Sequence, residues 1–173
     1  IVICLVFIVG VLVSSMNIDN EVLPSNSGIN YNSEVCVYKN NELIGCSHNM
    51  LYDTGKDFLR NITRGMVTND KLDRIELCNA TAGCGLPVAA GTELYSPYGA
   101  VCGLGVAAGT YGDLETGNWS VYKAFTSTCN NIEINATRLK NVNLLNFSGN
   151  NFTLVTLQNA DQLTENWTIS TSR

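Results

Sequence analysis

Residues 162–170, QLTENWTIS, decide the fold class of this chain. Here Trp167 and Ile169 alternate with the polar residues Asn166 and Thr168. Successive side chains of a strand point to opposite faces of a sheet. The pattern therefore predicts a strand with Trp167 and Ile169 in a core and the two polar residues in water. A glycan on Asn166 would then leave the fold undisturbed.

Other stretches of the chain carry the same signal. They are rich in β-branched and aromatic residues and are separated by Gly and Asn turns, which is typical of strands in a β-sandwich. The expected strands are residues 34–37, 42–46 (with 49–52 as a continuation), 72–78, 99–111, 119–129, 132–141 and 152–158. Residues 82–100 read as a long loop. No segment after Gly65 has the length and period of a crossover helix, so a parallel α/β fold is disfavoured.

One short helix is predicted in residues 54–66, TGKDFLRNITRGM. Thr54 followed three residues later by Asp57 resembles a capping box, and Gly65 suits the helix end. The apolar positions on one face are Phe58, Leu59 and Ile62. The expected fold is therefore mainly β, an antiparallel β-sandwich with one short helix.

Composition places this domain outside cells. The net charge is −5, and the ten Lys and Arg residues are scattered singly, so the chain lacks a basic patch for nucleic acid. The polar surface is instead built from 22 Asn, 12 Ser and 15 Thr residues.

The chain is rich in N-x-[ST] triplets, the acceptor motif for N-linked glycans. Chance placement of Ser and Thr would give roughly 3 or 4 such triplets, and there are seven. The acceptors are Asn61, Asn79, Asn118, Asn135, Asn146, Asn151 and Asn166. The alternative is that an Asn- and Thr-rich β protein makes these triplets by chance. We expect covalent N-linked glycans and no other cofactor.

Cysteine usage indicates an oxidising compartment. Six cysteines lie in the predicted domain, and Cys4 lies apart in the N-terminal segment. No Cys or His cluster has zinc-site spacing, so disulfides are favoured over a metal site. Local turns favour sequential pairing, which gives Cys36–Cys46, Cys78–Cys84 and Cys102–Cys129.

Residues with catalytic potential do not form a recognisable motif. The single histidine, His48, lacks a neighbouring nucleophile. The closest carboxylate pairs, Asp70 with Asp73 and Asp113 with Glu115, lie in polar, turn-like stretches where Asp commonly caps turns. Residues 113–118, DLETGN, lack the spacing of a calcium loop. We therefore assign no catalytic and no metal-binding residue, and we expect a protein that is not an enzyme.

The N-terminal segment, residues 1–13, IVICLVFIVGVLV, has no polar side chain. A bilayer span needs about 20 apolar residues. A segment that is apolar on every face needs burial on every face, which neighbouring copies can supply. Its burial is worth on the order of 20 kcal/mol of gross association energy. The residues expected to drive polymerisation are Ile1, Val2, Ile3, Leu5, Val6, Phe7, Ile8, Val9, Val11, Leu12 and Val13.

This layout resembles the archaeal type IV pilins and archaeal flagellins. The resemblance rests on residues 1–13 at the start of the chain, the polar hinge, the paired cysteines and the triplets. It implies cleavage before the apolar segment, retention of that segment in the mature protein, a helical homopolymer of identical subunits with apolar helices in the core, and glycosylated β domains outside. The subunit would meet the membrane only transiently before assembly. Two departures are the shorter segment and Leu5, where bacterial relatives carry an acidic residue.

The domain organisation follows from this interpretation. Residues 1–23 form the polymerisation segment, residues 24–33 a linker and residues 34–173 the β-sandwich, in an extracellular, cell-surface filament. In one alternative, the β-branched residues 1–13 insert as a donor strand into the next subunit. Two others are a monomeric glycan- or receptor-binding domain, with Tyr95 and Tyr98 as candidate contacts, and a secreted hydrolase that uses paired carboxylates.

Overall fold

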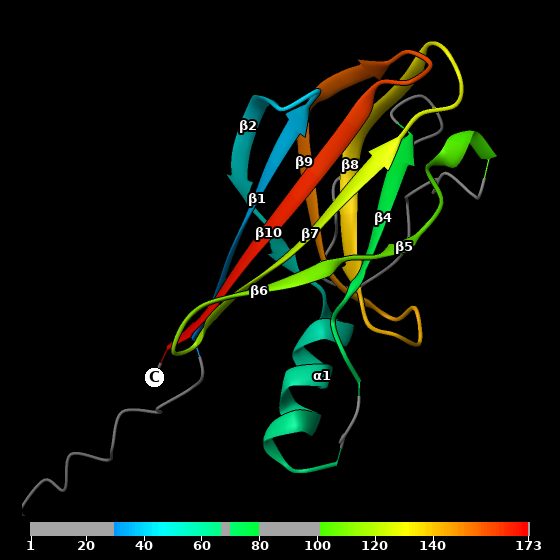
Figure 1. Ribbon diagram of the computed structural model, residues 1–173. Coiled ribbons are helices and arrows are strands. Elements are labelled where there is room, and N and C mark those ends of the chain that lie inside the picture. The colour runs from blue at the N-terminus through cyan, green and yellow to red at the C-terminus, as the bar shows by residue number, and fades with distance from the viewer. Residues whose placement is uncertain (1–29, 67–69, 80–100, 173) are drawn as a thin grey trace, which may run out of the picture.

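The computed structural model describes residues 30–66, 70–79 and 101–172, which form two antiparallel sheets packed face to face (Figure 1). Sheet A contains, in order, β2 (Glu42–His48), β1 (Asn30–Lys39), β10 (Gln162–Ser172), β7 (Asn118–Thr126) and β6 (Thr110–Glu115). Sheet B contains β3 (Met50–Leu51), β9 (Asn146–Leu157), β8 (Ile132–Lys140), β4 (Arg74–Asn79) and β5 (Ala107–Ala108). The predicted mainly β class with two antiparallel layers is confirmed.

Strand β10 is the central strand of sheet A. It pairs along its length with β1 on one side and with β7 on the other. Trp167 and Ile169 have no exposed surface, while Asn166 and Thr168 are half-buried on the outer face. The alternation that predicted this strand is confirmed.

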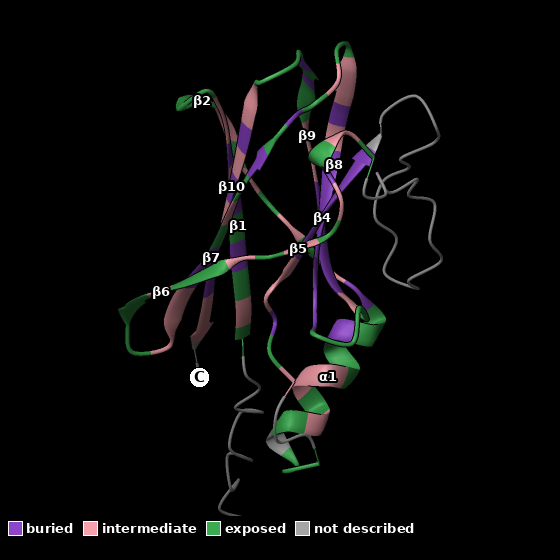
Figure 2. Cartoon of the chain, turned by 45° about the vertical axis from the view of Figure 1, so that its right-hand side comes forward, coloured by how far each residue is buried: buried purple, intermediate pink, exposed green. Residues whose placement is uncertain are grey.

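The core lies between the two sheets and is apolar along most of its length. Sheet A contributes Val35, Phe125 and Trp167, and sheet B contributes Ile75 and Leu139. Figure 2 shows that β4 and β8 are buried over most of their length, whereas β6 and much of α1 are exposed. A second, smaller buried cluster consists of Tyr52, Cys78 and Ala136.

The β1–β2 hairpin forms as predicted, but the prediction that residues 49–52 continue β2 is wrong. The turn is made by Asn40 and Asn41, which both have positive φ, a conformation that Asn tolerates. Met50 and Leu51 do not extend β2; they form β3 and pair with β9 in sheet B. The chain changes sheets at Asn49, whose side chain donates to the Ser33 hydroxyl across 2.6 Å.

The helix α1 (Asp53–Thr63) forms where it was predicted, but its N-terminal cap differs. The N-cap residue is Tyr52, without a side-chain cap bond, and the Thr54 hydroxyl instead donates to the Asn146 carbonyl across 2.5 Å. The predicted capping box is therefore wrong, because Thr54 is used to attach the helix to β9. At the other end Gly65 has φ +69°, and the N–H groups of Gly65 and Met66 return to the carbonyls of Ile62 and Asn61.

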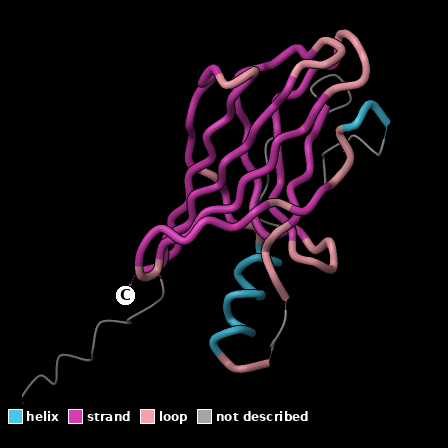
Figure 3. Tube along the Cα trace, viewed as in Figure 1, coloured by secondary structure: helices cyan, strands magenta, loops and turns pink. Residues whose placement is uncertain are grey.

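Gly55 lets α1 approach strand β9 closely. A Cβ atom at this position would lie 2.2 Å from the Phe147 carbonyl oxygen and 2.7 Å from Leu51 Cδ1. Phe58 and Leu59 pack against the core, whereas Ile62 is exposed. The helix therefore rests on β9 by its first turns and extends past the end of the sandwich, as the cyan coil in Figure 3 shows.

The predicted strand over residues 99–111 is wrong over most of its described length. Residues Val101–Gly103 form a 3-10 turn, and a two-residue strand, β5, follows. Cys102 and Gly103 both have positive φ, and a Cβ on Gly103 would lie 2.5 Å from the Thr126 carbonyl oxygen. Small residues are needed here for a close turn against β7, and a run of small apolar residues does not distinguish such a turn from a strand.

Two of the three predicted disulfides lie within the described residues. Cys36 is bonded to Cys46 across the β1–β2 hairpin, and Cys102 is bonded to Cys129. Cys78 is buried in β4, and its predicted partner Cys84 lies outside the described residues, so that pairing stays a prediction.

The strand β1 begins at Asn30, inside the predicted linker of residues 24–33. The last four residues of that linker pair with β10, from Asn30 opposite Ser172 to Ser33 opposite Ile169. In this part of β1 the ring of Tyr31 contacts Phe147, with centroids 5.4 Å apart. Because the residues around Tyr31 are polar, the sequence pattern indicated a linker at this position and not the start of a strand.

Candidate functional site

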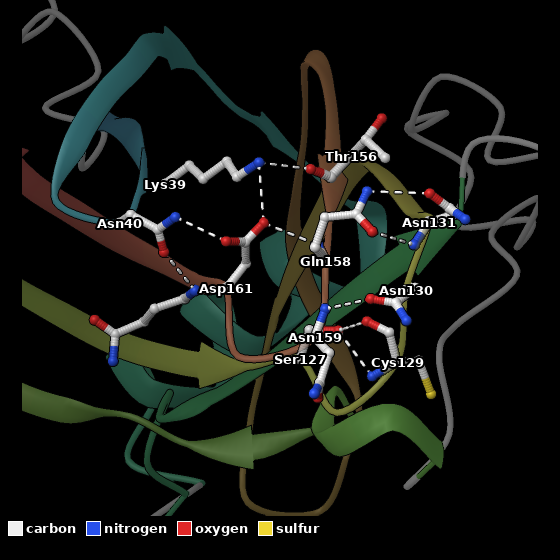
Figure 4. Close-up of polar contacts among 11 residues, drawn as sticks. Lys39, Asn40, Ser127, Cys129, Asn130, Asn131, Thr156, Gln158, Asn159 and Asp161 are labelled. Carbon is white, nitrogen blue, oxygen red and sulfur yellow. Dashed lines mark hydrogen bonds and ion pairs between the residues drawn. The ribbon is translucent and has the colours of Figure 1, made fainter.

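One end of the sandwich, which we call the distal end, is formed by three connections. These are the β1–β2 turn, the loop between β7 and β8, and the turn between β9 and β10 (Figure 4). Asn40, Asn131 and Ala160 all have positive φ here, so the backbone turns sharply in each connection. The side chains then meet in one network of polar contacts.

Asp161 lies at the centre of this network. Its carboxylate accepts hydrogen bonds from Asn40 Nδ2 and the Gln158 backbone N–H, both at 2.8 Å, and Lys39 Nζ lies 3.0 Å away. The hydrogen bond from Asn40 is the main cause that lowers the pKa of Asp161 to about 2, and the Gln158 N–H and Lys39 add to it. A carboxylate saturated with donors is a poor general base, and its role is to fix the loops.

The amides around Asp161 satisfy one another. Gln158 Nε2 donates to Asn131 Oδ1 across 3.0 Å, and the Asn159 backbone N–H donates to Asn130 Oδ1 across 2.9 Å. Asn40 Oδ1 accepts from the Gln162 N–H at 2.8 Å. The distal end is therefore an ordered polar surface.

Sequence-derived candidates for catalysis do not converge. His48 is exposed at the end of β2, opposite Glu34 of β1. Asp113 and Glu115 are exposed on β6, and Glu115 accepts a hydrogen bond from Asn118. Tyr95 and Tyr98 lie outside the described residues.

The carboxylates of the other candidate pair have separate structural roles. Asp70 Oδ1 accepts from Asn143 Nδ2 across 2.7 Å, which ties the approach to β4 to the turn between β8 and β9. Asp73 lies beside Arg74, with 3.4 Å between Oδ1 and Nε. The structure does not bring Asp70 and Asp73 to a shared cleft.

One group of potential metal ligands occurs in the described part of the chain. Ligand atoms of Glu34, Cys36 and Cys46 lie within 4.8 Å of one another on the outer face of sheet A. The two sulfur atoms are bonded to each other, and a metal ligand would need a thiolate. In this state the group does not provide a metal site.

The glycosylation triplets follow the alternation of the strands. In four of them the middle residue is aromatic and packs into or against the core, which leaves the acceptor Asn on the opposite side of the strand. These middle residues are Trp119, Phe147, Phe152 and Trp167. The alternation of a β-sandwich thus accounts for part of the excess over chance.

The described acceptors are half-buried, and their third residues differ in access. Asn61, Asn118, Asn135, Asn146, Asn151 and Asn166 are all half-buried, and the side chain of Asn79 lies outside the described part. In two triplets the third residue, Thr137 or Ser148, has no exposed surface. Thr153 after Asn151 is exposed and Thr168 after Asn166 is half-buried. Asn151 and Asn166 therefore present the more accessible triplets of the folded domain.

Sequence reasoning missed a buried carboxyl group between the sheets. Glu165 has no exposed surface; its Oε2 is hydrogen-bonded to the Thr137 hydroxyl and accepts from Trp167 Nε1 at 3.4 Å. Burial raises the pKa of Glu165 from 4.5 to about 8. The same alternation that placed Trp167 inward also places Glu165 inward, so the signal was present in residues 162–170.

Protonation of Glu165 resolves the competition for the Thr137 proton, although Glu165 Oε1 has no hydrogen-bond partner among the described residues. The Thr137 hydroxyl has a single proton, and it lies within reach of both Glu165 Oε2 and the Glu76 carbonyl, which is 3.1 Å away. A neutral Glu165 donates to Thr137, which then donates to Glu76. The buried group is therefore accommodated in its neutral form.

A second set of buried charges lies on sheet B. Glu76 Oε2 lies 2.8 Å from Arg138 Nη2 and 2.9 Å from Lys140 Nζ. All three side chains are buried, so removal of the carboxylate leaves buried positive charges without their anion.

Residues 1–13, the predicted polymerisation segment, lie outside the described residues. Within the described part of the chain, no helix combines the length and apolar character needed to span a membrane. Comparison with protein-family models, curated proteins and solved structures finds no match.

Proposed function

We propose that this protein is a non-enzymatic structural subunit of an extracellular, N-glycosylated filament, and that it polymerises through residues 1–13. The observation that carries the proposal is the relation between the core and this segment. The two sheets already bury each other's inner faces, with Trp167 and Ile169 on one side and Ile75 and Leu139 on the other. Thirteen further apolar residues therefore need partners beyond this core, and identical copies provide them.

The position at which the segment joins the domain also supports assembly. The strand β1 begins beside Phe147 and α1, at the end of the sandwich that we call the base. The polar distal end lies at the other end of β9 and β10 (Figure 1). A subunit built in this way directs its apolar segment toward a filament axis and its polar loops toward solvent.

The disulfides and glycosylation triplets fit an extracellular location. The Cys36–Cys46 and Cys102–Cys129 bonds persist in oxidising compartments, and the accessible triplets at Asn151 and Asn166 lie on different sheets. Glycans on both outer faces would cover the sides of the domain and leave its base free.

The test compares the full chain with a variant that lacks residues 1–13. Electron microscopy and sedimentation should show filaments for the full chain and monomers for the truncated one. Both should give the same thermal unfolding midpoint for the β domain. A full chain that remains monomeric under all assembly conditions would contradict the proposal. Mass spectrometry of native material should find glycans on Asn151 and Asn166.

A further inference from the structure

An exposed aliphatic turn lies at the base of the domain. Residues 141–145, NVNLL, connect β8 to β9. Val142, Leu144 and Leu145 are 40%, 50% and 60% exposed. Single exposed apolar residues are common, but three in one five-residue turn form a patch.

The turn is held rigidly from inside. Asn141 is 1% exposed, its Oδ1 accepts from the Leu145 N–H at 2.8 Å, and its own N–H donates to the Leu145 carbonyl. Asn143 Nδ2 donates to Asp70, and the Val142 N–H donates to the Lys71 carbonyl across 2.9 Å. The polar groups thus fix the turn, and the aliphatic side chains are left facing solvent.

Leu144 has an unfavourable backbone conformation for its type. Its φ is +63°, in the left-handed region that favours Gly and Asn and disfavours branched side chains. Among the described residues, Asn occupies three of the six non-Gly positions with positive φ, yet a leucine occupies this one. Such local strain is typical of residues kept for a function other than folding.

The helix α1 continues this apolar surface. Phe58 and Leu145 line the same small pocket, together with Phe147. Ile62 follows Phe58 by one helical turn on the same face and is 44% exposed. The charged residues of α1 are engaged elsewhere, since Lys56 pairs with Asp53 and Arg60 pairs with Asp57. We define Ile62, Val142, Leu144 and Leu145 as the basal patch.

The basal patch lies where the N-terminal segment joins the domain. Phe147 contacts both Tyr31 at the start of β1 and Phe58 of α1, with ring centroids 5.4 and 5.8 Å apart. Residues 14–29 can extend to about 50 Å, so residues 1–13 can reach the base of an adjacent molecule. The segment carries no polar side chain, so it contacts an aliphatic surface without leaving a buried polar group unsatisfied.

We propose that the basal patch is the docking surface for residues 1–13 of a neighbouring copy. This inference rests on the proposed filament function and adds the surface that receives the segment. A segment that is apolar on all faces is covered on one face by the basal patch and on the others by segments of further copies. Leu144 is therefore retained because it makes this contact, although Asn would suit the turn better.

Leucine substitutions separate docking from folding. Leu144→Asn should raise the unfolding midpoint of the domain by a few degrees, because Asn suits the left-handed turn, and should raise the critical concentration for assembly at least about tenfold. The matched control is Leu43→Asn, which replaces a leucine that is 53% exposed on β2 and should leave assembly unchanged. Equal assembly of the Leu144 variant and the wild type would overturn the inference.

Cross-linking through the native Cys4 identifies the occupant. One population carries Leu144→Cys with Cys4→Ser, and the other keeps Cys4 and carries an affinity tag. After co-assembly and treatment with a short bis-maleimide, mass spectrometry should find a peptide that joins Cys4 of one population to position 144 of the other. A Leu43→Cys variant should give no such product.

The outcomes distinguish this inference from the proposed function. Filaments that form without the cross-link between populations overturn the docking surface and leave the filament function standing. A cross-link found only within single chains of a variant that retains Cys4 and carries Leu144→Cys also overturns docking by a neighbour. A wild-type chain that never assembles overturns both.

Discussion

The two ends of this sandwich differ in how their connections are made. At the distal end the loops are held by polar contacts of amide side chains and of the Asp161 carboxylate. At the base the turn of residues 141–145 is held from inside by Asn141, and three of its four exposed side chains are aliphatic. Both ends use Asn to fix a turn. They differ in the contacts that fix the turns and in the side chains that the turns expose.

The largest change in the free energy of unfolding is expected from Glu165 in β10, the strand that joins the two ends. The pKa of Glu165 in β10 is raised from 4.5 to about 8, so folding favours its protonated form. The stability that this form provides is complete below pH 4.5 and is lost as pH rises toward 8, by at most about 1.4 kcal/mol per pH unit. Glu165→Gln should abolish this slope and exceed the wild type in stability at pH 8, measured by urea unfolding.

The control for Glu165 is Glu34→Gln, which replaces an exposed carboxylate of β1. It should keep the slope of the wild type. A wild-type stability that is constant between pH 5 and 8 would contradict the buried, neutral state of Glu165.

Of the two disulfides, the Cys102–Cys129 bond at the distal end should contribute more to the stability of the domain. Replacement of both Cys102 and Cys129 by Ser opens a loop of 27 residues and should cost about 3–4 kcal/mol in chain entropy. The same change at Cys36 and Cys46, which are 10 residues apart, should cost about 1 kcal/mol less. Denaturant unfolding of both double variants measures the difference, and the reverse order would contradict the loop-length argument.

At the base, stability should depend on the close contact of α1 with β9, which leaves no room for a side chain at position 55. Gly55→Ala places a methyl group 2.2 Å from the Phe147 carbonyl oxygen, so the helix must shift, at a cost of about 1–3 kcal/mol. Gly45→Ala is the control, because a Cβ there meets no atom within 4 Å. Thermal unfolding should show a lower midpoint for the first variant alone, and equal midpoints would mean that α1 is free to adjust.

The smallest effect is expected from the centre of the distal network. The pKa of Asp161 is lowered from 3.8 to about 2, so its contribution is present above pH 3.8 and is lost as pH falls toward 2. Asp161→Asn should remove this part of the acid dependence, and Asp113→Asn, on exposed β6, should retain it. Urea unfolding between pH 2 and 5 measures both, and identical acid profiles for the wild type and Asp161→Asn would contradict the role of the network.

The presence of several strands could be predicted, because a strand is signalled by the local alternation of apolar and polar residues. Residues 162–170 alternate clearly, residues 132–135 alternate up to a bulge between Ile134 and Ala136, and both segments form strands. Where residues 50–51 pair depends on a distant strand, β9, and local pattern holds no information about it. The capping box failed for a similar reason, since Thr54 is bonded to Asn146, which lies 92 residues away.

The features of the candidate surfaces were predictable only in part. The Cys36–Cys46 and Cys102–Cys129 bonds follow from turn signals between the cysteines. The distal network joins Asn40 to Asp161, 121 residues apart, and the basal patch joins α1 to the β8–β9 turn. Both need the register of the sheets, which the sequence does not show.

The pairing of β1 with β10 also determines how the domain responds to mechanical force. A pull on residues 1–29 enters the domain at Asn30, the first residue of a ladder that runs to Lys39 opposite Leu163. When that pull is resisted at the distal end, it loads the whole ladder in shear, so its hydrogen bonds share the force and do not open one at a time. Beyond the sixth pair, the covalent bond between Cys36 and Cys46 ties β1 to β2. The β1–β10 ladder is thus oriented to resist a pull between Asn30 and the distal end.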